Sequence, residues 1–228
     1  MTHGSLHIQD LRFGFSGQTA DLFHIPDLTL APGSSLGIRG PSGAGKTTLL
    51  HCLAGIEPAR GSIRWGASDL CQMDARTLTQ WRQQHLGLVF QDFHLVEGLS
   101  ALDNVLLPAS FSAWRASPAQ RVRATELLAR VGIHTPQRHA ELLSRGERQR
   151  VAVARALLFA PKVILADEPT ASLDPENREL IGALLLELAQ EHAATLIIVS
   201  HEESLLARLD ACQTLRAGNL HPVEAAHV

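Results

Sequence analysis

The sequence contains no tyrosine and only three cysteines, and aromatic residues make up 4% of it. Cys52, Cys71 and Cys212 are odd in number, lie far apart and lack the spacing of a metal site. A disulfide-stapled fold is therefore not indicated, and we expect free thiols in a reducing cytoplasm. The twelve histidines are mostly scattered singly, so the sequence predicts no histidine metal site either.

Long apolar runs are also missing. No stretch approaches the roughly 20 consecutive apolar residues that cross a bilayer. Residues 1–10 alternate polar and apolar side chains without the apolar segment of a signal peptide. We therefore expect neither a membrane span nor a secretion signal, so a role in a membrane process requires docking onto another chain.

Positive charge is neither abundant nor clustered. The 20 Lys and Arg residues are balanced by 23 Asp and Glu, which gives a net charge of −3, and no long basic run occurs. Because binding to a phosphate backbone needs clustered Lys and Arg, no nucleic-acid partner is indicated. The 228 residues, 45% hydrophobic and 19% charged, can form one sizeable core with at most a small appended subdomain.

The most informative stretch is a glycine-rich segment between an expected strand at 36–38 and an expected helix at 49–54. It consists of Gly40, Pro41, Ser42, Gly43, Ala44, Gly45, Lys46, Thr47 and Thr48. A glycine-rich turn that leads into a helix lets backbone N–H groups and the helix dipole converge on one anion. Lys46 is then placed to contact the β- and γ-phosphates, and Thr47 to bind Mg²⁺. A chance glycine-rich turn is the alternative, but the flanking strand and helix and the spacing of Lys-Thr-Thr disfavour it.

Polar side chains follow three further expected strands: Gln91 after 86–90, Asp167 and Glu168 after 162–166, and His201 after 195–199. Side chains just past the carboxyl ends of strands in an α/β sheet point into the ligand crevice. Gln91 can reach Mg²⁺ or an attacking water, and of the two carboxylates one can bind Mg²⁺ while the other polarises water. His201 is placed to contact the γ-phosphate. Ordinary polar strand ends are the alternative for the first three residues, and a capping or core histidine is the alternative for His201.

Two further segments carry weaker signals. Phe15 lies in or beside a turn, where it is either a core or edge residue or a platform for a nucleotide base, and composition leaves both open. Ser144 and Glu147 have the spacing of a capping box, which predicts a helix N-terminus there. With Gly146 nearby, that N-terminus is a second place fit to hold phosphate oxygens.

Alternating strands and helices predict an α/β fold, in which a mostly parallel sheet is covered by helices on both faces. Antiparallel strands are expected within residues 6–38. Residues 92–160 are arginine-rich and helical in pattern, which predicts a helical subdomain inserted between two core strands. We expect one domain over 1–228, with the core in 1–91 and 161–220 and a frayed tail at 221–228.

In order, spacing and strand context, these motifs resemble those of the nucleotide-binding subunit of ATP-binding cassette (ABC) transporters over about residues 6–220. Residues 40–48 are similar to the family's Walker A loop, 143–147 to its signature, 163–167 to its Walker B strand and 172–174 to its D-loop. Gln91 is similar to the Q-loop glutamine, Glu168 to the catalytic glutamate and His201 to the switch histidine. Phe15 lies where the family stacks an aromatic ring on adenine. The resemblance implies a P-loop NTPase core with an N-terminal antiparallel β subdomain.

The resemblance also implies a head-to-tail dimer with a second copy or a paralogous ATPase subunit, and two Mg-ATP molecules between the subunits. Each ATP contacts the Walker A loop of one chain and Ser144 and Gly146 of the other, with Asp174 in the neighbouring D-loop. Water then attacks the γ-phosphorus with Glu168 as base. Lys46, Mg²⁺ and the opposing Ser144 stabilise the developing charge, and His201 supports them.

A transmembrane permease subunit is the implied partner, which places the chain at the cytoplasmic face of the inner membrane. An ATP-dependent scaffold or regulatory module with little turnover is the alternative function. Arg145 departs from the family, because it stands where the signature has its first glycine. Residues 86–108 and 143–157 look most like the lipoprotein-releasing and macrolide-exporting group of these ATPases.

Overall fold

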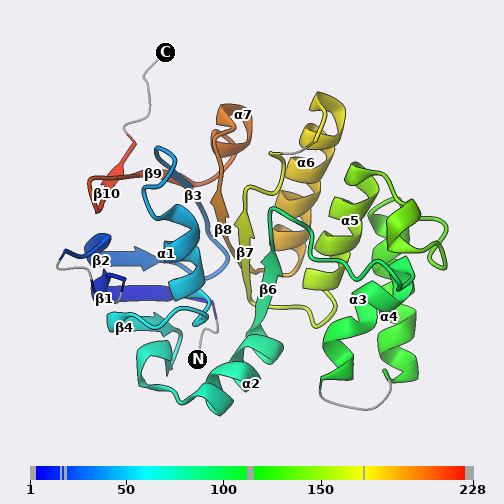
Figure 1. Ribbon diagram of the computed structural model, residues 1–228, viewed down its shortest axis with the longest axis horizontal. Coiled ribbons are helices and arrows are strands. Elements are labelled where there is room, and N and C mark those ends of the chain that lie inside the picture. Colours follow the sequence, from blue (N-terminus) through cyan, green and yellow to red (C-terminus); the bar gives the residue numbers. More distant parts are fainter. Residues whose placement is uncertain (1–3, 16, 18–19, 112–115, 172, 224–228) are drawn as a thin grey trace.

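The computed structural model describes residues 4–15, 17, 20–111, 116–171 and 173–223. Two sheets and a group of helices form the molecule (Figure 1), with the six-stranded sheet between the four-stranded sheet on one side and helices α3, α4 and α5 on the other. No helix among the described residues is long and apolar enough to cross a membrane.

The six-stranded sheet has the order β10-β9-β3-β8-β7-β6. Its strands are β3 (Ser35–Arg39), β6 (Leu86–Val89), β7 (Val163–Asp167), β8 (Thr195–Val199), β9 (Ala211–Arg216) and β10 (Asn219–Pro222). Every neighbouring pair is parallel except β9 and β10. Parallel strands end at the same edge, so the chain leaves β3, β6, β7 and β8 beside one another there.

The four-stranded sheet is antiparallel, with the order β2-β1-β4-β5. Its strands are β1 (Leu6–Phe13), β2 (Phe23–Leu30), β4 (Arg60–Trp65) and β5 (Ser68–Asp69). The pairing of β1 with β4 is irregular between Gln9 and Arg12, where Asp10 has a φ of 47°. Such a bulge bends the strand and re-aims the side chains around it.

The helices are α1 (Lys46–Leu53), α2 (Ala75–His85), α3 (Ala101–Ser110), α4 (Pro118–Arg130), α5 (Arg145–Ala156), α6 (Pro175–Glu191) and α7 (Glu203–Leu206), with 3₁₀ turns at Leu70–Gln72 and Ala140–Leu142. Ser144 caps α5 as predicted, since its Oγ accepts from the Glu147 N–H at 3.2 Å. The Glu147 carboxylate accepts in return from the Ser144 N–H at 2.8 Å, which completes the capping box.

The core lies on both faces of the six-stranded sheet, but helices alone cover only one face, because the antiparallel sheet packs with α1 on the other. Ile164 and Ile198 point into a cluster with residues of α3 to α6, whereas Leu165 and Ile197 point into a cluster with α1 and the antiparallel sheet. All residues of β7 and β8 are buried, which is why these strands are continuous apolar runs rather than alternating ones.

One expected boundary is wrong. The sequence pattern predicts a frayed tail from residue 221, but His221 and Pro222 belong to β10, and the Val223 N–H donates to the Cys212 carbonyl at 3.0 Å. The C-terminal hairpin is therefore part of the sheet. Residues 224–228 lie outside the described residues.

Candidate active site

A cavity of about 730 Å³ opens at the carboxyl ends of β3, β6, β7 and β8. Most of the predicted site residues line it: Phe15, Ser42, Gly43, Gly45, Lys46, Thr47, Thr48, Gln91, Asp167, Glu168 and His201. Sequence segments more than a hundred residues apart thus meet at one sheet edge, as the positions of the strand ends predict.

The glycine-rich loop has the geometry of an anion cradle. Gly43 and Gly45 have φ values of 77° and 95°, in the left-handed region that favours glycine. The first turn of α1 contains no acidic residue, and Gly45 offers no side-chain cap. The N–H groups and the positive end of the helix dipole therefore remain available to an anion in the cavity.

Lys46 is buried, and its ammonium group lies inside the loop. Its Nζ donates to the carbonyl oxygens of Gly40 at 2.9 Å and Pro41 at 3.1 Å. Position 40 must be a glycine because the backbone of β9 lies against it, and a Cβ there would lie 2.3 Å from the Leu215 carbonyl oxygen. The loop is thus packed against the C-terminal hairpin.

Asp167 ends β7 and is 5% exposed. Among the described residues its Oδ1 has no hydrogen-bond partner. A buried carboxylate oxygen without a partner is costly unless a cation or donor satisfies it. Carboxylate, hydroxyl and amide oxygens are the donor types that Mg²⁺ prefers, so Asp167, Thr47 and Gln91 in one cavity fit this ion.

Glu168 combines a strained backbone with a partly buried carboxylate. Its φ is 44°, and its N–H donates to the Val199 carbonyl of β8 at 2.8 Å. This hydrogen bond fixes the bend of the chain at the end of β7. Burial raises the pKa of its carboxyl above the ordinary value of 4.5, and the nearby His201 partly opposes this rise. The His201 Nε2 lies 3.4 Å from the Glu168 Oε1.

His201 lies between two members of a hydrogen-bond network that sequence analysis missed. The Thr170 hydroxyl donates to the Glu202 carboxylate at 2.8 Å, and the Glu202 N–H donates to the Ser200 hydroxyl at 3.0 Å. Thr170, Ser200, Glu202 and Arg178 all line the cavity. Their adjacency to the predicted motifs was the available signal, but single polar residues beside a motif are too common to be singled out.

Phe15 forms one wall of the cavity. It is 49% exposed, and its ring meets that of the buried Phe13 edge to face, with centroids 5.3 Å apart. Phe13 in turn stacks on Phe23 at 5.8 Å. A half-exposed ring that faces a cavity and rests on a buried aromatic pair favours the base platform over the core residue.

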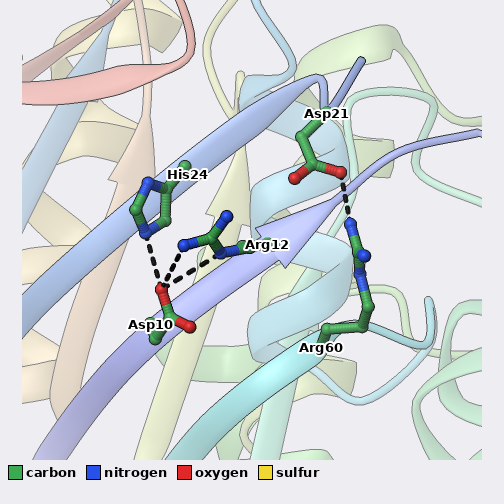
Figure 2. Close-up of polar contacts among 5 residues, drawn as sticks. All are labelled: Asp10, Arg12, Asp21, His24 and Arg60. Atoms are coloured by element: carbon green, nitrogen blue, oxygen red, sulfur yellow. Dashed lines mark hydrogen bonds and ion pairs between the residues drawn. The ribbon is translucent and has the colours of Figure 1, made fainter. Parts of the chain in front are cut away.

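The loop that carries Phe15 is closed by contacts at its ends. The Leu22 N–H donates to the Phe13 carbonyl at 2.7 Å, and the Asp21 carboxylate accepts from the guanidinium of Arg60 in β4. Figure 2 shows this pair beside a second cluster, in which the carboxylate at the β1 bulge bonds Arg12 and His24.

The remaining predicted residues lie elsewhere. Gly40 and Pro41 line a neighbouring cavity of about 320 Å³ that His201 also lines, and Ala44 packs against the core cluster below α1. Ser144 and Gly146 are at the N-terminus of α5, and Asp174 caps α6. None of these three lines the main cavity. Ser172 of the D-loop segment lies outside the described residues.

The N-termini of α5 and α6 nevertheless lie against each other. A Cβ on Gly146 would lie 2.6 Å from the Asn177 Oδ1. Asn177 is bound to the cap of α6, since its Nδ2 donates to the Asp174 carboxylate at 2.7 Å. Ser144, Gly146 and Asp174 are therefore grouped as a second patch, separate from the cavity.

The chain was compared with known proteins. The family model described as "ABC transporter" matches residues 23–171. The lipoprotein-releasing system ATP-binding protein LolD of Idiomarina loihiensis is 39% identical over 225 residues, 97% of this chain and 98% of that protein. The LolD protein of Treponema denticola is 38% identical over 213 residues, which cover 92% and 94% of the two chains.

Solved structures agree with these sequence matches. The ATP-binding cassette MJ0796, described as a dimer in a post-hydrolysis state bound to ADP and Pi, has a TM-score of 0.83 and 29% identity. The match covers 96% of this chain and 99% of MJ0796, and a second dimeric structure of the same cassette matches equally well. With its cavity, glycine-rich loop and strand-end carboxylates, the chain belongs to the ABC transporter family as an ATP-binding, ATP-hydrolysing subunit.

Proposed function

We propose that this subunit hydrolyses Mg-ATP in a head-to-tail dimer and that the resulting motion drives a transmembrane permease. The observation that carries the proposal is the separation of the two patches. The cavity holds the residues for one triphosphate, but Ser144, Gly146 and Asp174 lie outside it. A second chain that faces the first places its α5 N-terminus over that cavity.

In this proposal Asp167, Thr47 and Gln91 would hold Mg²⁺, which would neutralise charge on the β- and γ-phosphates. Lys46 and the N–H groups of residues 43–48 bind the phosphates, and Phe15 stacks on the base. These residues fix the nucleotide between the sheet edge and the antiparallel sheet, so that the γ-phosphate points toward Glu168.

Glu168 serves as the base that orients and deprotonates the attacking water. Its raised pKa makes it a better proton acceptor than an ordinary surface carboxylate. His201, 3.4 Å from the Glu168 carboxylate, contacts the γ-phosphate and holds that carboxylate in place. The Ser144 hydroxyl of the opposing chain, whose oxygen already accepts from the Glu147 N–H, donates to the same phosphate.

The helical subdomain at 92–160 transmits closure of the dimer to the permease at the cytoplasmic face of the inner membrane. Because the relatives are named for lipoprotein release, we propose that the permease releases lipoproteins from that membrane. The closing partner is a second copy or a paralogous ATPase subunit.

Mixing two inactive variants tests the composite site. Lys46→Ala removes the phosphate lysine and Ser144→Arg blocks the opposing helix N-terminus, so each variant alone releases almost no inorganic phosphate. In an equal mixture one site of every mixed dimer is intact, and about a quarter of the wild-type rate returns. A mixture as inactive as its components contradicts the composite site. Dimerisation of the wild type without phosphate release, with the permease present, supports the scaffold alternative.

A further inference from the structure

Arg145 contacts its own chain rather than pointing freely away from it. It is the first residue of α5 and is exposed, and its guanidinium carbon lies 6.0 Å from the centroid of the Phe93 ring. That separation is at the range of a cation–π contact. The side chain that departs from the family's glycine thus reaches the loop that follows Gln91.

This loop has an uncommon backbone. Phe93 and His94 have φ values of 51° and 45°, which are unfavourable for residues with bulky side chains. Consecutive left-handed residues persist only where neighbouring groups hold them. The required contacts come from Arg155 at the opposite end of α5, whose guanidinium donates to the carbonyl oxygens of Phe93 at 2.6 Å and His94 at 2.5 Å.

Ring contacts connect the same loop to the phosphate-binding helix. The His94 ring meets Phe90 edge to face with centroids 4.9 Å apart, and Phe90 meets His51 of α1 at 6.4 Å. Gln91, which lines the cavity, lies between Phe90 and the loop. A shift of Gln91 therefore acts on the Phe93–His94 loop, which both ends of α5 contact through Arg145 and Arg155.

The other side of the α5 N-terminus is fixed. Gly146 packs so closely on Asn177 of α6 that an added Cβ would lie 2.6 Å from its side-chain oxygen. The helix N-terminus thus rests on α6 on one side and on the Phe93 ring, through Arg145, on the other. Ser144 lies directly beside both contacts.

We propose that Arg145 is a positioning residue, which ties Ser144 to the Gln91 loop through the Phe93 ring and so sets the orientation of the surface offered to the opposing chain. The proposal deepens the proposed function and rests on it. It assigns Arg145 to its own subunit and not to the phosphates of the opposing nucleotide. Losing the contact therefore weakens nucleotide-dependent pairing without weakening nucleotide binding to one chain.

A double-mutant cycle in the Glu168→Gln background tests this. Arg145→Ala and Phe93→Leu are made singly and together, with Arg145→Lys and Phe93→Tyr as controls that keep the cation and the ring. The dimer dissociation constant is measured with Mg-ATP by analytical ultracentrifugation. Binding of a fluorescent ATP analogue to the isolated chain and melting temperature are recorded in parallel.

Each single truncation raises the dimer dissociation constant about two- to fivefold, and the double variant is no worse than either single one. Arg145→Lys and Phe93→Tyr raise the dimer dissociation constant less, and the affinity of the isolated chain for nucleotide is unchanged in all variants. If the two substitutions raise the dimer dissociation constant additively, or if only Arg145→Ala raises it, the proposal is overturned in favour of a contact between Arg145 and the phosphates across the dimer. Tighter pairing of the truncated variants overturns it as well. If Glu168→Gln itself does not pair with Mg-ATP, the proposed function fails instead.

Discussion

At the scale of single residues, the bend at the end of β7 determines how Glu168 faces the cavity. A left-handed φ of 44° is costly for a glutamate and is held by the hydrogen bond to Val199. The bend turns the chain between Asp167 and Pro169, so that the neighbouring carboxylates have different surroundings. Within the part of the chain that the structure describes, the Asp167 Oδ1 has no hydrogen-bond partner, whereas the Glu168 Oε1 lies 3.4 Å from the His201 Nε2.

Replacement of Glu168 by glutamine should abolish turnover but preserve nucleotide binding. Glutamine has nearly the same shape but cannot accept the proton of the attacking water. We expect the rate of phosphate release to fall at least about 100-fold, with ATP-dependent dimers accumulating. Phosphate assays and light scattering with Mg-ATP measure both effects. Turnover close to wild type would show that another group acts as the base.

The same replacement predicts a pH-dependent change in stability. Because burial raises the Glu168 pKa above that of the unfolded chain, the carboxyl destabilises the folded state as pH rises above the unfolded value of 4.5. Glu168→Gln, which stays neutral, should therefore melt about 1–3 °C higher than the wild type near pH 7.5. The difference should vanish at about pH 4, where both side chains are neutral. Thermal scans across this range would refute the prediction if the difference stayed constant.

At the scale of elements, the antiparallel sheet supplies the wall that carries Phe15. Its loop is closed between β1 and β2 by the Asp21–Arg60 ion pair, in which Arg60 is largely exposed. An exposed ion pair is worth little in total stability. Its effect should instead be visible in the position of the ring over the cavity.

We expect Arg60→Ala and Asp21→Ala each to raise KM for ATP by at most about fivefold while kcat stays unchanged. Exchanging the two charges in one chain should restore much of the loss. Arg12→Ala is the matched control, because Arg12 bonds Asp10 on the same sheet and is not joined to the Asp21–Arg60 pair (Figure 2). An equal rise in KM with the control would mean that the whole sheet is disturbed.

Several elements could be predicted from sequence, and others could not. Strands β7 and β8 were readable because burial on both faces makes them continuous apolar runs, and the cap of α5 was readable because Ser144 and Glu147 have the spacing of a capping box. The strand β9 contains Cys212, Gln213 and Thr214 and has no clear period, so only its pairing with β3 makes it a strand. Helix α3 lies within the region predicted to be helical, but its bounds could not be predicted, because Pro108 lies inside it and an interior proline argues against a helix.

At the scale of the whole molecule, the candidate site is divided between two surfaces. Sequence patterns placed the cavity residues correctly because strand ends of a parallel sheet share one edge. They also marked Ser144 as phosphate-binding, but the resemblance alone indicated that it serves a second chain. In the structure the α5 N-terminus lies outside the cavity, so the two groups of predicted site residues lie on separate surfaces.

A peripheral subunit should bind membranes only through its partner. Because the proposed attachment to the membrane runs through the permease, we expect the chain expressed alone to remain in the supernatant after ultracentrifugation. Coexpression with its permease should move it to the membrane fraction, and high salt should not extract it fully. Immunoblots of both fractions measure this. Sedimentation with membranes that lack the permease would contradict the proposed docking.

The C-terminal hairpin has a consequence for biosynthesis. Its Leu215 carbonyl oxygen lies where any Cβ on Gly40 would go, and the Gly218 carbonyl oxygen accepts from the His24 N–H at 2.7 Å. Residues 211–222 leave the ribosome long after the glycine-rich loop, yet they buttress it. A nascent chain released before them lacks the strand that packs against its anion cradle, so we expect affinity for ATP to arise only after β9 has been synthesised.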